Sequence, residues 1–305
     1  MTSSVLPSSA NHPGQAVPRV FIGLPVYNGA RFLAEALDSL LSQTFRDFVL
    51  FISDNASTDN TEQICAEYAA RDERIRYFRQ PVNIGAPRNW NFVADQARGE
   101  YFKWATSNDI CHQDMLAACV AALDADPQAV LSQGRTILVD EDTEAQTEYH
   151  HDLALPGRLP SQRLRQLLLE LALNNGQTGL IRLSELRKTR LDRLYPDGDI
   201  AFMAELALLG KFVVLPQFLL YRRMGSSTFT CLLRGDAIGE FFGKQAMESW
   251  IGHRLRLHLD IVRAALTMPI PLSERWTSLG CALRFMAWNR HRIWNELVQA
   301  FSFSR

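Results

Sequence analysis

From Arg19 onward, short apolar runs alternate with stretches whose apolar residues recur at helical spacing. The apolar runs that predict buried strands cover 19–24, 48–53, 75–78, 101–105 and 130–139. The helical stretches between them cover 30–43, 59–70, 88–96 and 115–123. Because parallel strands are joined by crossover helices, this alternation predicts an α/β fold with a mixed, mostly parallel sheet flanked by helices.

The second half of the chain is less regular. Residues 140–158 are polar and predict a loop, a leucine stripe over 164–171 predicts a helix, and 174–179 predict a turn. A helix over 199–209 and a strand over 212–215 follow, and beyond about residue 225 the pattern is helical. We therefore predict three regions. These are a flexible tail (1–18), an α/β domain (19–225) and a helical C-terminal region (226–305).

Composition argues against several classes of protein. The 305 residues include 32 basic and 33 acidic side chains, so the net charge gives no reason to expect nucleic acid as a partner. The five cysteines are scattered without a CxxC pair, which argues against a zinc ribbon and favours a reducing compartment. No apolar run approaches the roughly 18 residues of a membrane-spanning helix. The sequence thus predicts a cytoplasmic protein.

Polar clusters follow each of the first four predicted strands. They read PVYNG, DNASTD, NIGAPRN and SND. Each alone fits a turn or a helix cap, but the carboxyl ends of parallel strands share one edge of a sheet, where ligands bind. The four together therefore predict a polar ligand site. A phosphate-loop site is not indicated, since GxGxxG and GxxxxGK[ST] are absent.

Several segments, in order, resemble glycosyltransferase family 2. They are PVYNGARFLAEALDSLLSQTFRDFVLFISDNASTDNT, NIGAPRNWN, YFKWATSND and DIAFMAELALLGKFVVLPQFLLYRR, within about 20–223. The resemblance implies the Rossmann-like GT-A fold and an inverting transfer of a sugar from a nucleoside-diphosphate sugar. A UDP-sugar is the favoured donor and a dTDP-sugar the next, because thymine presents the same pairing edge. The implied acceptor is a hydroxyl of a glycan or a lipid-linked molecule, in bacterial surface polysaccharide biosynthesis.

The resemblance also implies roles for individual residues. The implied nucleotide-sugar-binding residues are Pro25, Tyr27, Asn28, Asp54, Asn55, Ser57, Arg88, Asn108 and Asp109. Asp54 matches the acid that hydrogen-bonds uracil, and Arg88 lies at a position near the phosphates. Asp109 matches the last acid of a DxD-like element that binds Mg²⁺ or Mn²⁺. We accordingly expect Asp54, Arg88 and Asp109 to surround one activated sugar.

Two departures from the family pattern bear on the metal. The segment Ser107-Asn108-Asp109 keeps a single carboxylate, and Met224 stands where the family often has a histidine. One carboxylate with phosphate oxygens still suffices for Mg²⁺, which keeps several of its waters. Alternatively, Arg222 or Arg223 supplies positive charge to the phosphates.

An inverting transfer needs a base that takes the proton of the acceptor hydroxyl. The family places an aspartate at the start of the helix before the ALLGKF segment, which matches Asp199, with Asp197 as the second candidate. An aspartate at this place also fits a helix cap. Glu205, in the middle of the helix, is expected to be structural.

The C-terminal region combines basic and aromatic residues. Residues 250–305 contain eight arginines against three acidic residues, interleaved with Trp276, Trp288, Trp294, Phe301 and Phe303. This composition fits contact with the inner face of the cytoplasmic membrane. It also fits helices that pack on the catalytic domain or form a homodimer. Rival functions for the whole chain are a sugar nucleotidyltransferase and a non-catalytic nucleotide- or glycan-binding homologue.

Overall fold

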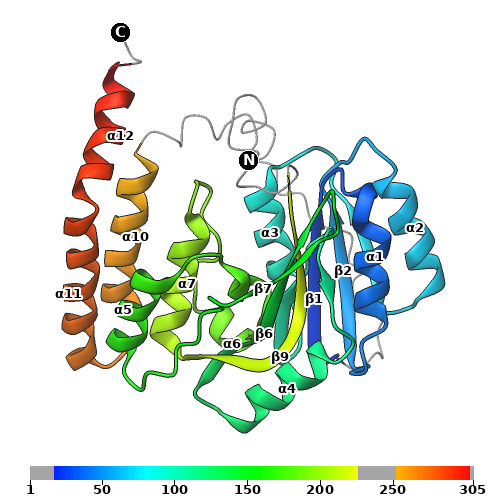
Figure 1. The fold of residues 1–305 in the computed structure, drawn as a ribbon, viewed down its shortest axis with the longest axis horizontal. Helices are drawn as coiled ribbons and strands as arrows, with labels where there is room; N and C mark the ends of the chain where they lie inside the picture. The colour runs from blue at the N-terminus through cyan, green and yellow to red at the C-terminus, as the bar shows by residue number, and fades with distance from the viewer. Residues whose placement is uncertain (1–16, 226–251, 303–305) are drawn as a thin grey trace.

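A nine-stranded mixed sheet forms the centre of this computed structural model, which describes residues 17–225 and 252–302 (Figure 1). The strands are β1 (Val20–Val26), β2 (Phe48–Asp54), β3 (Ile75–Arg79), β4 (Tyr101–Trp104), β5 (Ile110–Cys111), β6 (Ala129–Asp140), β7 (Gln146–Tyr149), β8 (Leu180–Arg182) and β9 (Lys211–Met224). Their order is β3-β2-β1-β4-β8-β6-β9-β5, and β7 pairs with β6. Strands β5, β7 and β8 run against the other six, so the predicted mixed, mostly parallel sheet is confirmed.

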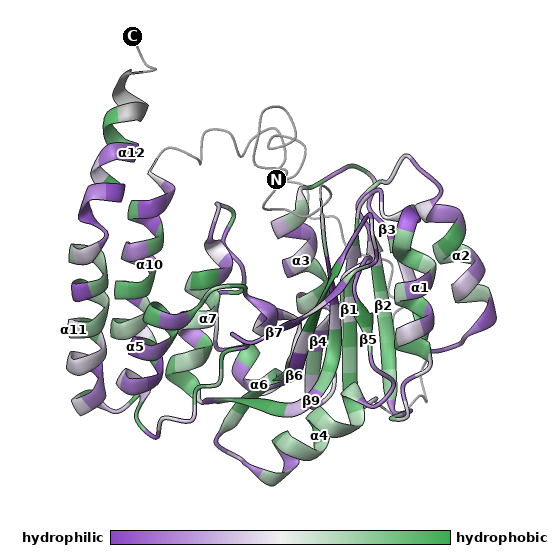
Figure 2. Ribbon diagram, viewed as in Figure 1, coloured by the Kyte–Doolittle hydropathy of each residue, from purple (hydrophilic) through white to green (hydrophobic). Residues whose placement is uncertain are grey.

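Helices cover both faces of the sheet (Figure 1). They are α1 (Ala30–Leu41), α2 (Thr61–Arg71), α3 (Ala86–Asp95), α4 (Met115–Ala125), α5 (Pro160–Glu170), α6 (Leu183–Leu186) and α7 (Gly198–Leu209), with a 3-10 turn, η1, at Asn175–Thr178. Strand side chains alternate between the faces: Ile22 packs in the core with α1, whereas Phe21 packs in the core with α3. Being covered on both faces, β1 is buried along its whole length, and Figure 2 shows the central strands as largely hydrophobic.

The structure differs from the sequence prediction in the part of the sheet beyond β4. The predicted loop at 140–158 contains β7, and Leu155 bridges to Phe212. Strands β5 and β8 were not predicted, and β9 is far longer than 212–215. Strands of two to four residues have too few side chains to show a period, so their pairing partners decide their conformation.

The C-terminal part is helical, as predicted. Within its described residues, 252–302, it consists of α10 (His253–Thr267), α11 (Leu272–Trp288) and α12 (Arg290–Ser302). Leu257, Ile261 and Ala264 of α10 join the hydrophobic core that contains α5 and α7. Among the described residues, no helix is long and apolar enough to cross a membrane. Residues 226–251, with which the predicted C-terminal region begins, and residues 1–16 of the predicted tail lie outside the described residues.

Candidate active site

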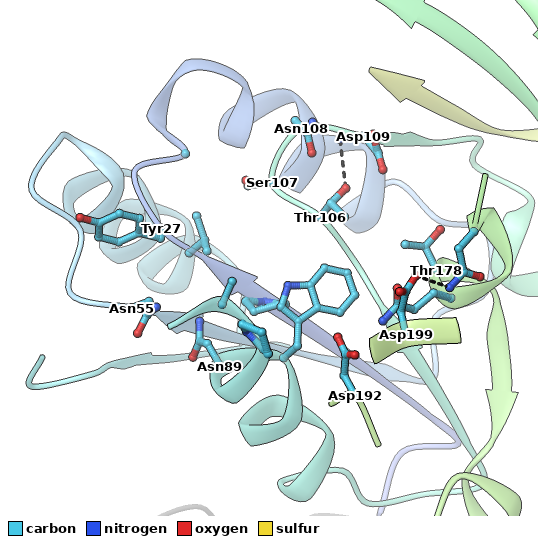
Figure 3. A pocket seen from close by; sticks show the side chains of 18 of the residues that line it. Tyr27, Asn55, Asn89, Thr106, Ser107, Asn108, Asp109, Thr178, Asp192 and Asp199 are labelled. Atoms are coloured by element: carbon cyan, nitrogen blue, oxygen red, sulfur yellow. Dashed lines mark hydrogen bonds between the residues drawn. The ribbon is translucent and has the colours of Figure 1, made fainter. Parts of the chain in front are cut away.

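A cavity of about 710 Å³ lies beyond the carboxyl ends of β1 and β4. Figure 3 shows Tyr27 and Asn55 on one side of it and Asp192 and Asp199 on the other. The predicted site residues that line it are Pro25, Tyr27, Asn28, Asn55, Asn108, Asp109, Asp197, Asp199, Arg222 and Arg223. The predicted residues Asp54, Ser57 and Arg88 are absent from the lining. The volume suits a ligand of nucleotide-sugar size.

Two strand–helix loops are joined beside the cavity. Asn28 has a positive φ of 49°, and its backbone N–H donates to Ser57 Oγ at 2.9 Å. The N–H of Thr58 donates to Asn28 Oδ1 at 2.8 Å, and the N–H of Gly29 donates to Thr61 Oγ1 at 2.9 Å. Ser57 is therefore a buried residue that orders the loop, rather than part of the cavity lining.

The position of Asp54 differs from the prediction. Its side chain is fully buried, Oδ1 accepts the Ser57 N–H at 2.9 Å, and Oδ2 accepts the Tyr77 hydroxyl at 3.0 Å. These bonds offset the desolvation of the carboxylate within the protein. Asn55 reaches the cavity instead, because successive side chains at the end of a strand point in opposite directions.

Asn55 is held in place by its own amide. Its Nδ2 donates to Asn83 Oδ1 at 2.8 Å, and its Oδ1 accepts the backbone N–H of Ile84 at 2.9 Å. A primary amide has two donor hydrogens and two acceptor lone pairs, so a donor and an acceptor remain. Asn55 therefore presents a mixed hydrogen-bonding edge to the cavity.

The prediction for Arg88 also differs from the structure. Arg88 is exposed, and its nearest hydrogen-bond acceptor is the Ile84 carbonyl at 3.5 Å. Its neighbours Pro87, Asn89 and Trp90 line the cavity. Because α3 turns by about 100° per residue, Arg88 lies off the face that these residues present. Of the three residues that we expected to surround one ligand, Asp109 lines the cavity, whereas Asp54 and Arg88 do not.

The sequence analysis assigned neither Trp90 nor Trp104 to the site, but in the structure Trp90 lines the cavity and Trp104 is buried behind it. Trp104 is fully buried, and its Nε1 donates to the Trp90 carbonyl at 3.0 Å. Trp90 stacks on Trp104 with ring centroids 5.9 Å apart and forms part of the cavity wall. The buried indole thereby sets the position of an aromatic surface that faces the ligand.

Asp109 lies at the end of the β4 loop, among positive charges. Its Oδ1 accepts the backbone N–H of Arg223 at 3.0 Å. Burial raises the pKa of Asp109, while the hydrogen bond with Thr106 and the charges of Arg222 and Lys103 oppose the rise. In the described part of the chain, no group of three or more His, Cys, Asp or Glu residues could hold a metal ion. The donor set fits a cation that takes one oxygen from Asp109 and the rest from phosphates and water.

The two predicted phosphate-binding arginines are not equivalent. Arg223 is buried and pairs with Glu35 and with Glu144, the latter at 2.7 Å, so its charge is already balanced. Arg222 donates to Asn175 Oδ1 at 2.5 Å. Within residues 17–225 and 252–302, no acidic side chain forms a salt bridge with Arg222. The other arginines of the described cavity lining all form salt bridges, so Arg222 has the charge most available to an anionic ligand.

Carboxylates gather on the opposite side of the cavity. Asp199 lies in the first turn of α7, and its Oδ2 accepts Asn174 Nδ2 at 2.7 Å. Burial raises the pKa of Asp199, the Asn174 hydrogen bond opposes this rise, and the charge of Asp197 adds to it. Burial, and next the charge of Asp199, raise the pKa of Asp192 well above its ordinary value. A raised pKa makes a carboxylate a stronger base.

An ion-pair network holds the loop that carries Asp192. Arg190 Nε and Arg193 Nη2 donate to the buried Glu205 Oε1 at 2.9 and 2.6 Å. Arg190 Nη1 lies 2.8 Å from Asp260 Oδ1 of α10, and the Tyr195 hydroxyl donates to Asp260 Oδ2 at 2.5 Å. The prediction that Glu205 is structural is confirmed. The network also ties a C-terminal helix to the wall of the cavity.

Sequence reasoning missed part of the cavity lining. Asp192, Arg31, Asn174 and Gln177 all line it. Asp192 and Asn174 lie in irregular segments and Gln177 in the short 3-10 turn η1, and no periodic sequence pattern predicts where such segments lie in the fold. The one available signal for Asp192 was its position seven residues before Asp199 in an acidic, arginine-rich turn.

A family model matches more than half of the chain. Residues 21–188 match the model described as "Glycosyl transferase family 2". The chain belongs to glycosyl transferase family 2. The rival assignment as a sugar nucleotidyltransferase is therefore dropped. The match covers the loops at 25–29, 54–59 and 106–109, each of which contributes residues to the cavity lining.

Relatives of this family share short segments with the chain. An uncharacterized glycosyltransferase of Rickettsia felis is 32% identical over 142 residues, which are 46% of this chain and 23% of the relative. Glycosyltransferase GlyG of Streptococcus pneumoniae is 31% identical over 97 residues, 32% of each protein. The matched segments thus span a third or less of these relatives' own length.

Solved structures of similar fold extend the comparison to most of the chain. S. aureus TarS 1–349 in complex with UDP-GlcNAc superposes with a TM-score of 0.60 at 17% identity, covering 88% of this chain and 72% of TarS. Mannosyltransferase PcManGT from Pyrobaculum calidifontis, in complex with GDP-Man and Mn²⁺, gives 0.52 at 16% identity, covering 94% and 80%. These neighbours confirm the predicted GT-A fold.

Proposed function

We propose that this member of glycosyl transferase family 2 is an inverting enzyme that transfers a sugar from a nucleoside-diphosphate sugar to a hydroxyl of a glycan or lipid-linked acceptor. Surface polysaccharide assembly is the proposed setting. The observation that carries the proposal is a cavity large enough for a nucleotide sugar. Polar residues line one side of it, and on the other side lie two carboxylates, Asp192 and Asp199, whose pKa values are raised. Such a site can hold a donor and deprotonate an acceptor.

The donor side favours a pyrimidine base. Asn55 takes the place expected of Asp54, and its amide keeps one donor and one acceptor that no hydrogen bond within residues 17–225 and 252–302 uses. Uracil and thymine present an N–H next to carbonyl oxygens, which complements that edge. The UDP-GlcNAc bound by the neighbour TarS is consistent with this choice. We accordingly place a UDP-sugar first and a dTDP-sugar second.

The diphosphate needs positive charge as the sugar–phosphate bond breaks. Arg222 provides one fixed charge, and its planar guanidinium suits phosphate oxygens. Asp109, beside Asn108, would hold Mg²⁺ or Mn²⁺ with one oxygen, and the bound ion would stabilise the leaving diphosphate. The Mn²⁺ in the neighbour PcManGT supports this cofactor.

Asp199 is the proposed base, as its place in the sequence predicts. Asn174 fixes the carboxylate through Oδ2, and desolvation increases its basicity. In the transfer, Asp199 takes the proton of the acceptor hydroxyl while that oxygen bonds to the anomeric carbon and the bond to the diphosphate breaks. Asp197 is exposed at the rim and stays the second candidate.

The test combines donor binding with turnover. A panel of UDP-, dTDP- and GDP-sugars, with and without Mn²⁺, is screened by thermal shift, because a bound ligand raises the melting temperature. Hydrolysis of each stabilising donor is then measured. Asp199→Asn should bind the donor normally and lose about 10²- to 10⁴-fold in turnover. Binding of a donor without any turnover would point to a non-catalytic binding protein instead.

A further inference from the structure

The helices α11 and α12 expose large apolar side chains at the edge of the molecule (Figure 1). Trp276, Trp288 and Trp294 are 70%, 73% and 66% exposed, and Leu272 is 71% exposed. Tryptophan is usually well buried in a folded protein. Three such side chains on two adjacent helices therefore call for an explanation other than packing within the chain.

These side chains lie on the solvent-exposed side of the two helices, which we call the outer face. It consists of Leu272, Trp276, Leu283, Arg284 and Trp288 of α11 with Arg290 and Trp294 of α12. A shallow groove of about 310 Å³ joins the two helices, and Leu283, Met286, Ile293, Trp294 and Arg290 are among its lining residues. The opposite side of α11, with Ser278 and Ala282, is buried. The fold therefore uses only one side of α11.

The C-terminal helices have more basic than acidic side chains. Residues 252–302 contain seven arginines and three acidic residues. All three acids bond to other parts of the chain: Asp260 to Arg190, Glu274 to the Ser161 N–H at 3.0 Å, and Glu296 to the backbone N–H of Arg254 at 3.1 Å. The outer face itself contains arginines and no acid, so it is cationic as well as apolar.

We propose that the outer face of α11 and α12 rests on an anionic lipid bilayer. Indole rings favour the boundary between headgroups and acyl chains, and arginines bind anionic headgroups. A second copy of the chain is the other occupant to consider. In a two-fold dimer it would bring this cationic surface against itself, where like charges repel. The bilayer satisfies both the tryptophans and the arginines.

This contact with a bilayer would bring the cavity close to lipid-linked acceptors. Its biological role therefore rests on the proposed function. Lipid binding is nevertheless measured without donor or acceptor. Failure of the catalytic proposal would therefore leave the lipid result intact, and loss of lipid binding would leave donor hydrolysis unchanged.

The experiment is flotation of the full chain with phosphatidylcholine vesicles and with vesicles that also contain phosphatidylserine. We expect binding only to the anionic vesicles and release at high salt. Arg284→Gln with Arg290→Gln should weaken binding about 25-fold, at about fivefold for each arginine. Trp276→Ser with Trp294→Ser should weaken it by about tenfold or more.

A matched control keeps the test decisive. Val82→Ser with Arg71→Gln changes an exposed apolar side chain in the loop after β3 and an exposed basic side chain at the end of α2, both outside the outer face, and should bind vesicles like the parent. Thermal melting verifies that every variant is folded. Absence of binding to anionic vesicles would overturn the proposal. So would equal binding by all variants, or a dimer in sedimentation velocity that the tryptophan variants dissociate.

Discussion

The ion-pair network behind the cavity makes a quantitative prediction for Glu205→Gln. Glu205 has a side chain only 1% exposed and accepts from Arg190 Nε, Arg190 N and Arg193 Nη2 at 2.6 to 2.9 Å. Glutamine keeps the size of the side chain and removes its charge. Arg193, 10% exposed, then depends on the more distant Asp260, whose Oδ2 lies 3.5 Å from Arg193 Nε.

The expected cost follows from burial. Removing one partner of a buried ion pair costs about 3–5 kcal/mol. Asp260 remains as a counter-charge and Arg190 is one-third exposed, so we expect the lower end, about 3 kcal/mol. The entropy of unfolding is about 2.1 cal/mol/K per residue, or about 0.64 kcal/mol/K for 305 residues. The melting temperature should therefore fall by about 5 °C.

Calorimetry at neutral pH measures this shift, and donor turnover provides a second readout. Because the network positions the loop with Asp192, turnover should fall by about tenfold while donor affinity changes little. The control is Glu67→Gln, whose partner Arg71 lies 3.6 Å away with both side chains largely exposed. It should shift melting by less than about 1 °C. A Glu205→Gln protein that melts at the same temperature as this control would refute the conclusion that the ion-pair network stabilises the fold.

Three further predictions concern the cavity. The raised pKa of Asp192 means that the folded state binds more protons than the unfolded state between the ordinary and the raised pKa, so stability falls as pH rises through that window. Asp192→Asn should therefore melt above the parent at pH 7 and lose this advantage near pH 4; an equal gain at both would contradict it. Arg222→Gln should weaken donor binding by roughly tenfold or more and Arg88→Gln should not, and isothermal titration would expose the reverse order as an error. Asp109→Ala should abolish the Mn²⁺-dependent part of donor binding in the same assay, whereas an unchanged Mn²⁺ response would exclude Asp109 as a ligand.

Much of the fold was predictable because burial imposes a period on the sequence. The strands at the centre of the sheet are covered on both faces, and their largely apolar runs marked β1, β2 and β4, although β4 also contains the buried Lys103. The crossover helices carried apolar residues on one side, as α1 does with Leu33 and Leu37. Strands β5, β7 and β8 have two to four residues and form because a partner strand lies beside them. No local pattern encodes that partner.

The candidate site divides in the same way. The sequence alone determined the sheet edge at which the polar clusters meet, because crossover helices make the first four strands parallel and so place their carboxyl ends at one edge. Tertiary structure decided which side chain of each cluster faces the ligand: Asn55 rather than Asp54, and Asn89 rather than Arg88. The side chains of neighbouring residues point in directions about 180° apart in a strand and about 100° apart in a helix. An assignment that is wrong by one residue therefore names a side chain on another face. Asp192 could not be identified from the sequence as a cavity residue. Its loop is held beside the cavity by ion pairs of Arg190 with Glu205 and Asp260, which are distant from the loop along the chain.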